Sequence, residues 1–256
     1  MKNFKILVIP DVHGRDFWRE PLKQTLENTD ARIVFLGDYC DTYPNEFEHG
    51  VDYNTKAIDG LKEIIGLKKQ HPERITLLIG NHDCGYRFEL SLCDCRTDYR
   101  NYNTIQKLFQ SNKDLFQLAD EVYINGKHFI FSHAGIHKGY VKAAFPNEYD
   151  SITEANVVAY FNNGYLIEDA KLINSLGMYD LYRGFGGWDY GSIVWADIRS
   201  WFGKEGYDGY GYQVVGHTQL NHGCGGFIQD NIADLDSAEA FVITDEGEIK
   251  PWKTIL

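Results

Sequence analysis

The sequence predicts an α/β fold of the mixed (α+β) kind, with two packed mixed β-sheets flanked by helices. Two observations carry this prediction. The first part of the chain alternates short apolar runs with helical stretches in the order β-α-β-α-β, which indicates parallel strands joined by crossover helices. Later apolar runs are separated by short turn sequences, which indicates antiparallel strands in addition.

The parallel strands are predicted from apolar runs near the N-terminus. A strand begins at Phe4 and leads into a helix over about residues 17–27, and a second strand begins at Ala31. A second helix over about residues 54–69 has a partly apolar face and returns the chain to a strand over residues 75–79. These elements form a βαβ opening that is extended by one further strand.

The antiparallel strands are predicted from turn residues between apolar runs. Asn125-Gly126 lies within the stretch 121–131, and this dipeptide is the strongest short signal for a hairpin. Near the C-terminus, apolar runs at 226–235, 238–244 and 248–252 predict a terminal antiparallel meander. The sheet arrangement is therefore expected to be mixed.

Five short motifs along the chain carry carboxylate, amide or imidazole groups. They are Asp11-Val12-His13, Gly37-Asp38-Tyr39-Cys40-Asp41, Gly80-Asn81-His82-Asp83, Ser132-His133-Ala134-Gly135 and Gly216-His217-Thr218. Loops beyond the carboxyl ends of parallel strands converge on one crevice, so these distant residues can meet. Their donor mixture suits Mn, Fe, Zn or Co and is too large for one tetrahedral ion. Each motif alone is also explained by a helix cap or a turn, but together they favour a bridged pair of metal ions.

This ordered set of motifs resembles the calcineurin-like metallophosphoesterase superfamily, within the branch that contains PPP-type serine/threonine phosphatases and bacterial diadenosine tetraphosphatases. The resemblance extends from Asp11 to about Ser237. It implies a four-layer sandwich that forms a single domain over residues 1–256.

The resemblance also implies a ligand set. Asp11, His13 and Asp38 would hold the first metal ion, and Asp38, Asn81, His133 and His217 would hold the second. Asp38 would then bridge the two ions. His82 would protonate the leaving group, and Asp41 would orient His82.

The sequence departs from the PPP pattern after Asp41. PPP phosphatases continue with Arg-Gly, whereas this chain has Thr42-Tyr43, so a phosphate-binding arginine is missing at that position. The candidate replacements are Arg15, Arg183 and Arg199.

Arg15 has a second explanation, because it is close in sequence to Asp16 and Glu20 and is able to pair with either of them on a helix surface.

Two stretches, at about residues 84–120 and 160–212, do not fit the sheet pattern. They follow the third and fourth motifs, so we expect insertions that form the wall of the substrate cleft. Alternatively, their aromatic residues pack a satellite core.

Composition limits the functional classes. The chain has 256 residues and a net charge of −12, which argues against general nucleic-acid binding. Its five cysteines form no even disulfide framework, and Cys93-x-Cys95 lacks the second pair of a metal site. No apolar leader opens the chain and no run approaches about 20 apolar residues, so we expect a cytoplasmic protein without membrane contact.

The resemblance implies hydrolysis of phosphate monoesters by a metal-bridging hydroxide. The two divalent ions are expected to be Mn²⁺, and Fe and Zn are the alternatives. The expected partner is a phosphorylated substrate, either a phosphoprotein or a small phosphate ester or nucleotide. A hydrolase of dinucleoside polyphosphates is the alternative function. A third candidate function is a noncatalytic scaffold with the same fold. The complete ligand set and His82 argue against it. Oligomeric state is left open by the sequence.

Overall fold

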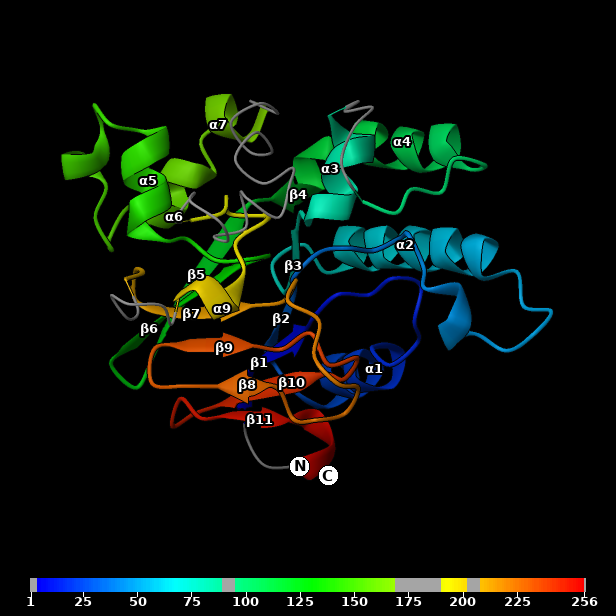
Figure 1. Ribbon diagram of the computed structural model, residues 1–256. Helices are drawn as coiled ribbons and strands as arrows, with labels where there is room; N and C mark the ends of the chain where they lie inside the picture. The colour runs from blue at the N-terminus through cyan, green and yellow to red at the C-terminus, as the bar shows by residue number, and fades with distance from the viewer. Residues whose placement is uncertain (1–3, 89–94, 169–189, 202–207, 256) are drawn as a thin grey trace.

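The computed structural model describes residues 4–88, 95–168, 190–201 and 208–255 (Figure 1). Within these residues, the first sheet has six strands in the order β11-β10-β1-β2-β3-β4. Their bounds are β1 Phe4–Ile9, β2 Arg32–Phe35, β3 Ile75–Leu78, β4 Phe116–Gln117, β10 Phe241–Thr244 and β11 Ile249–Pro251. Strands β1 to β4 are parallel to one another, and β10 and β11 add an antiparallel edge next to β1.

The second sheet has five strands among the described residues, in the order β5-β6-β7-β9-β8. Their bounds are β5 Ala119–Ile124, β6 Lys127–Ser132, β7 Tyr212–Val215, β8 Phe227–Ile228 and β9 Ile232–Asp234. The three central strands are parallel, and the edge strands β5 and β8 are antiparallel. Both sheets are therefore mixed, which confirms the predicted fold class.

Strand β1 shows how the core is divided. Alternate side chains point to opposite faces of a strand, so Ile6 and Val8 pack between the two sheets while Leu7 and Ile9 pack toward the helices. All four side chains are buried. A strand that is buried on both faces reads as a continuous apolar run, which explains why the sequence pattern located it.

Helices cover the outer faces. Their bounds are α1 Arg19–Asn28, α2 Tyr53–Gln70, α3 Asn81–Arg87, α4 Tyr102–Ser111, α5 Lys138–Ala144, α6 Val157–Phe161, α7 Gly164–Glu168 and α9 Ile198–Trp201. In Figure 1, α1 and α2 lie on one side of the first sheet, and α5 and α6 lie beside the second. Helix α2 begins at a true cap, because the Asp52 side chain accepts a hydrogen bond from the Thr55 N–H at 3.2 Å. The two helices predicted from sequence are confirmed, with ends shifted by one or two residues.

The predicted hairpin is confirmed at Asn125-Gly126. Strands β5 and β6 pair antiparallel up to Ile124 and Lys127, which leaves two residues in the turn. Asn125 and Gly126 have φ of 50° and 75°, the left-handed values that a two-residue hairpin turn requires.

The predicted terminal meander is wrong, because its strands belong to different sheets. Strands β8 and β9 form a hairpin in the second sheet, whereas β10 and β11 form one in the first. Strand β9 lies parallel to β7, and β10 lies antiparallel to β1. An apolar run identifies a strand but not the neighbour with which it pairs, so the pattern could not show this exchange.

The two expected insertions differ from the expectation at their ends. Segment 84–120 contains α4, but it ends in β4 and the start of β5, so its last residues belong to the sheets. Segment 160–212 similarly ends at the start of β7, and its residues 169–189 and 202–207 lie outside the described residues. None of the described helices is long and apolar enough to span a bilayer.

Candidate metal centre

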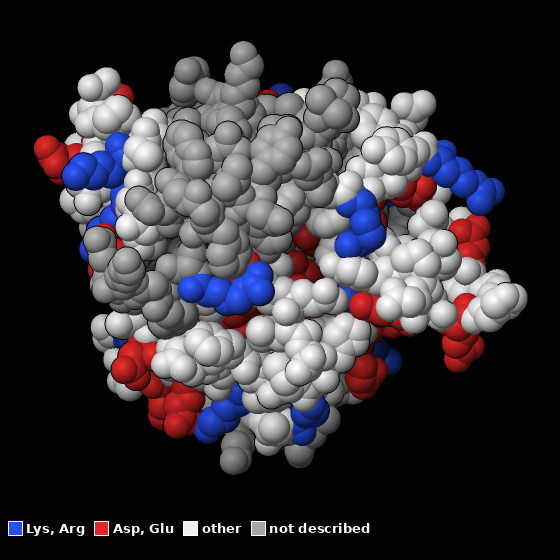
Figure 2. Space-filling model, in the orientation of Figure 1, with Lys and Arg blue, Asp and Glu red and all other residues white. Residues whose placement is uncertain are grey.

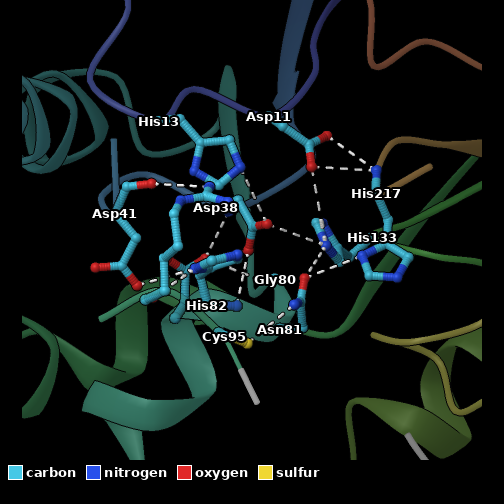
Figure 3. A network of polar contacts seen from close by, with 12 residues as sticks. Asp11, His13, Asp38, Asp41, Gly80, Asn81, His82, Cys95, His133 and His217 are labelled. Carbon is cyan, nitrogen blue, oxygen red and sulfur yellow. Dashed lines mark hydrogen bonds and ion pairs between the residues drawn. The ribbon is translucent and has the colours of Figure 1, made fainter. Parts of the chain in front are cut away.

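Both sheets supply the six residues that were predicted to bind metal. Asp11, Asp38 and Asn81 follow β1, β2 and β3 of the first sheet, and His133 and His217 follow β6 and β7 of the second. His13 lies two residues after Asp11. Each residue stands at the carboxyl end of a strand, where loops converge. Figure 3 shows these side chains directed toward a common centre.

The side chains lie at distances that suit ligands of shared cations. The Asn81 Oδ1 atom is 2.9 Å from His133 Nε2 and 3.0 Å from His217 Nδ1. The Asp38 Oδ2 atom is 3.5 Å from both His13 Nε2 and His133 Nε2. Donor atoms within 4.8 Å of one another form two groups, Asp11 with Asp38 and His133, and His13 with Asp38 and His82. Asp38 belongs to both groups, as a bridging carboxylate would.

The far side of two imidazole rings is held by backbone carbonyls. His13 Nδ1 lies 2.8 Å from the Cys40 carbonyl oxygen, and His133 Nδ1 lies 2.9 Å from that of Leu36. A carbonyl only accepts hydrogen bonds, so each Nδ1 carries the hydrogen and donates it. The lone pair of each Nε2 then faces the centre, which is the tautomer that a metal ligand needs.

Several residues of the centre have an unusual backbone conformation. His13, Asp38, Asp41 and His217 have φ of 44°, 53°, 57° and 70°, in the left-handed region. Residues other than glycine adopt this region rarely, and such residues cluster at functional sites. Their concentration in three of the five motifs supports a functional role for these loops.

Two motif glycines leave room for carboxylates. A Cβ atom at Gly80 would lie 2.1 Å from Asp38 Oδ1, and a Cβ atom at Gly216 would lie 2.0 Å from Asp11 Oδ2. Any side chain at either position would displace a predicted metal ligand. This close approach is the physical reason for glycine at these two positions.

Asp83 ties the second motif to the third, a role that sequence reasoning missed. Its carboxylate accepts hydrogen bonds from the N–H groups of Asp38 at 2.8 Å, Tyr39 at 3.1 Å and Gly80 at 2.8 Å. Burial raises the pKa of Asp83 to about 7, against the opposing effect of these three donors. The available signal was an acidic residue a few positions after the strand predicted over residues 75–79.

Burial makes the unpaired charges of this centre unfavourable. It raises the pKa of Asp38 well above its usual range, and the charges of Asp11 and Asp83 raise it further. Burial also lowers the pKa of His13 well below 6.5. Buried carboxylates beside neutral imidazoles are stabilised by divalent cations, so this donor set fits a metal centre.

His82 and Asp41 form a buried pair next to the predicted ligands. His82 Nδ1 lies 2.9 Å from Asp41 Oδ2 and 3.0 Å from the Arg96 carbonyl oxygen, so Nδ1 donates to these acceptors. Burial lowers the pKa of His82, but the Asp38 and Asp41 carboxylates outweigh it and raise the pKa above 6.5. Asp41 is itself held by the Tyr86 hydroxyl and by the Asp98 N–H, which lies 3.0 Å away.

Two of the three candidate arginines are engaged elsewhere. Arg15 pairs with Glu46, at 2.6 Å from Nε to Oε2, and not with the helix-surface acids considered above. Arg199 is exposed and holds Asp197 with Nε at 2.8 Å and Nη2 at 2.6 Å. Neither arginine lines the cavity over the centre. Arg183 lies outside the described residues.

A cavity of about 250 Å³ opens over the centre. It is lined by six of the predicted residues, Asp11, His13, Asp38, Asn81, His82 and His217, and also by Tyr43, Cys95, Arg96, Trp195 and Asp236. Figure 2 shows acidic atoms deep in a hollow near the middle of this face, with basic side chains beside it. Sequence reasoning missed the roles of these residues, although it placed Arg96 in a segment expected to form the cleft wall.

The sequence matches the calcineurin-like phosphoesterase family over residues 4–221. The chain therefore belongs to this family and is a metal-dependent phosphoesterase. Membership implies a centre of two divalent ions, for which the two groups of donor atoms provide candidate ligands. No curated protein sequence matches the chain.

Solved structures with the same fold are distant in sequence. A cold-active protein-tyrosine phosphatase of a psychrophilic Shewanella species is 16% identical, with a TM-score of 0.57 over 98% of this chain and 80% of that one. A point mutant of a cold-active protein tyrosine phosphatase is 16% identical, with a TM-score of 0.55 over the same shares. A serine/threonine phosphatase of Saccharomyces cerevisiae is 15% identical, with a TM-score of 0.49 over 95% of this chain and 74% of that one. The first two confirm the fold.

Proposed function

We propose that this protein hydrolyses phosphate monoesters in the manner of a protein phosphatase, with two Mn²⁺ ions held by the six ligands and His82 as general acid. The carrying observation is the contact of His82 Nδ1 with Asp41 Oδ2 at 2.9 Å, because His82 also lines the cavity together with five of the six proposed ligands. When bound, two divalent ions supply a hydrolytic nucleophile from water and neutralise charge on the phosphoryl oxygens. The same donor set also suits Fe or Zn.

The residues beside the metal ligands would handle the proton. Hydrolysis of a serine phosphate releases an alkoxide, which needs a proton as the ester bond breaks. Asp41 fixes the hydrogen of His82 on Nδ1, so the proton for the leaving group is carried on Nε2. Asp41 also favours the imidazolium form through its negative charge.

The size of the cavity supports recognition of a phosphoryl group. Pockets that enclose a drug-sized ligand measure about 300–1,000 Å³. The cavity defined by the described residues is smaller, at about 250 Å³, so a phosphoryl group fits while a large leaving group extends outside. This favours monoesters with varied leaving groups over an enclosed dinucleotide.

A metal reconstitution assay tests the proposal. Protein stripped with a chelator and reloaded with Mn²⁺, Fe²⁺ or Zn²⁺ would be given phosphoserine, phosphothreonine and phosphotyrosine peptides, nitrophenyl phosphate and diadenosine tetraphosphate. Phosphotyrosine is included because one protein of the same fold is named a tyrosine phosphatase. We expect hydrolysis of monoesters only after reloading. Preference for the dinucleotide would support the alternative hydrolase, and no turnover with any metal would overturn the proposal in favour of a scaffold.

A further inference from the structure

Arg96 is the one arginine or lysine that lines the cavity, among the residues that the structure describes. It lies between α3 and α4, and its side chain is exposed at the mouth of the cavity. Asp11, Asp38 and Asp236 line the same cavity, so acidic side chains outnumber basic ones among its described lining residues. A phosphate monoester is itself an anion, and beyond bound metal ions it needs a cationic group at this wall.

The side chain of Arg96 is held in place by two contacts. Its guanidinium carbon lies 3.4 Å from the centre of the Tyr43 ring, which is a close cation–π contact. Its Nη2 donates a hydrogen bond to the Asp41 carbonyl oxygen at 3.1 Å. A guanidinium has five N–H donors in one plane, so donors remain for the oxygens of an anion.

Position 42 explains why an arginine is needed from another segment. Thr42, which stands where the PPP pattern has arginine, is buried and directs its Oγ1 toward Asn54 of α2, at 3.3 Å. Position 42 therefore contributes no cation to the cavity. Arg96 reaches the adjacent residues Asp41 and Tyr43 from a different part of the chain.

Arg96 is also electrostatically connected to the centre. Its positive charge adds to the lowering of the His13 pKa by burial, and it opposes the net rise that carboxylates cause in the His82 pKa. Its carbonyl oxygen accepts from His82 Nδ1. The backbone of Arg96 thus contacts the proposed acid, while its guanidinium lies within electrostatic range of the metal ligands.

We propose that Arg96 binds the nonbridging oxygens of the substrate phosphoryl group and of the phosphate product, and that it replaces the arginine missing at position 42. This assignment rests on the proposed phosphomonoesterase function. Tyr43 positions the guanidinium by stacking against it, and Asp41 shares one of its N–H groups. Arg96 is then a substrate-binding residue, distinct from His82, which acts on the leaving group.

Phosphate binding tests the assignment without catalysis. The affinity of Mn²⁺-loaded protein for inorganic phosphate would be measured by calorimetry for the wild type and for the variants R96A, R96K and R100A. Arg100 is exposed in the same segment and does not line the cavity, so R100A is the matched control. Loss of hydrogen bonds from a charged group predicts a Kd about 10- to 100-fold higher for R96A, an intermediate value for R96K, and no change for R100A.

A leaving-group series separates direct binding from an effect through His82. The nonbridging oxygens are the same in every monoester, so R96A should lower kcat/KM by a similar factor for nitrophenyl phosphate and for alkyl phosphates. If Arg96 acted only by positioning Asp41 and His82, the loss would grow with the pKa of the leaving group. Free guanidine added to R96A should restore part of the activity, but it should not affect R100A.

The outcomes distinguish this assignment from the proposed function. An unchanged phosphate Kd in R96A, with two metal ions retained, would overturn the role of Arg96 while leaving the hydrolase proposal intact. A wild-type protein that binds phosphate but hydrolyses no monoester would overturn the function, and the R96A calorimetry would still decide the role of Arg96. If R96A fails to fold, R96K provides the same comparison, because lysine keeps the charge and loses the planar fork.

Discussion

Removal of the His82 imidazole separates a general acid from a metal ligand. The donor atoms of His82 lie within 4.8 Å of those of His13 and Asp38, so the geometry alone permits either role. As an acid, His82 should contribute about 10²- to 10⁴-fold to the rate for esters with poor leaving groups. At about 1.36 kcal/mol per tenfold change in rate, this corresponds to about 3–5 kcal/mol in the activation barrier.

The assay compares kcat for the wild type, H82A and D41N across esters whose leaving groups range from nitrophenolate to alkoxide. A nitrophenolate leaves readily as an anion, so H82A should lose little activity on it and most activity on alkyl esters. D41N should show a weaker form of the same pattern, because an asparagine at this position would tolerate the left-handed φ of 57° but carry no charge. Both variants should retain two metal ions per chain.

Equal losses across the series would refute the assignment of His82 as proton donor. Loss of one metal ion from H82A would identify His82 as a ligand instead. A folding defect would be recognised separately, because it would lower activity on all esters and release metal together. The H82A and D41N measurements therefore test the hydrogen bond between His82 and Asp41, which is the observation on which the proposed mechanism depends.

Three further predictions concern the metal ligands and the fold. G216A should weaken metal binding by at least about tenfold in competition with a chelator, because the added Cβ would lie 2.0 Å from Asp11 Oδ2. The control variant G66A should bind metal as the wild type does, because a Cβ at Gly66 has no atom within 4 Å. D38N, which tolerates the left-handed backbone, should lose metal ions and activity together in elemental analysis; two retained ions with full activity would contradict the bridging role. Burial lowers the pKa of His137 from 6.5 to about 4, so the unfolded chain binds more protons between these pH values and native stability should fall as the pH drops through this window. The H137N variant keeps a capping side chain for α5 but does not titrate in this range. In urea unfolding, its free energy of unfolding relative to that of the wild type should therefore increase by up to about 3 kcal/mol from pH 7 to pH 4. A difference in unfolding free energy that does not change with pH would contradict this prediction.

The parts of the fold that are buried on both sides could be predicted from sequence. Val34 and Phe35 of β2, for example, are both fully buried, so solvent imposes no alternation and the strand appears as an apolar run. The motifs that follow such strands were recognisable because loops beyond the carboxyl ends of parallel strands converge, although here they follow strands of two sheets. Their convergence did not require knowledge of any side-chain contact.

The arginines show what the sequence could not determine. Arg15 pairs with Glu46, which is 31 residues away, and Arg96 stacks on Tyr43 from a segment without apolar periodicity. Such contacts depend on how irregular segments fold back across the surface, and neither periodicity nor local spacing encodes that path. Proximity in sequence therefore suggested Asp16 or Glu20 as partners of Arg15, which was wrong.

The division of the predicted metal ligands between the two sheets has a consequence for the stability of the molecule. Asp11, Asp38 and Asn81 follow strands of one sheet, and His133 and His217 follow strands of the other. An ion bound across this seam works as a cross-link that exists only in the native state, and a ligand at about 100 times its Kd adds about 2.7 kcal/mol to native stability. Metal supply would thus control resistance to heat and proteolysis as well as turnover. Hydrogen exchange in chelated protein should accelerate first along the strand ends that face this seam.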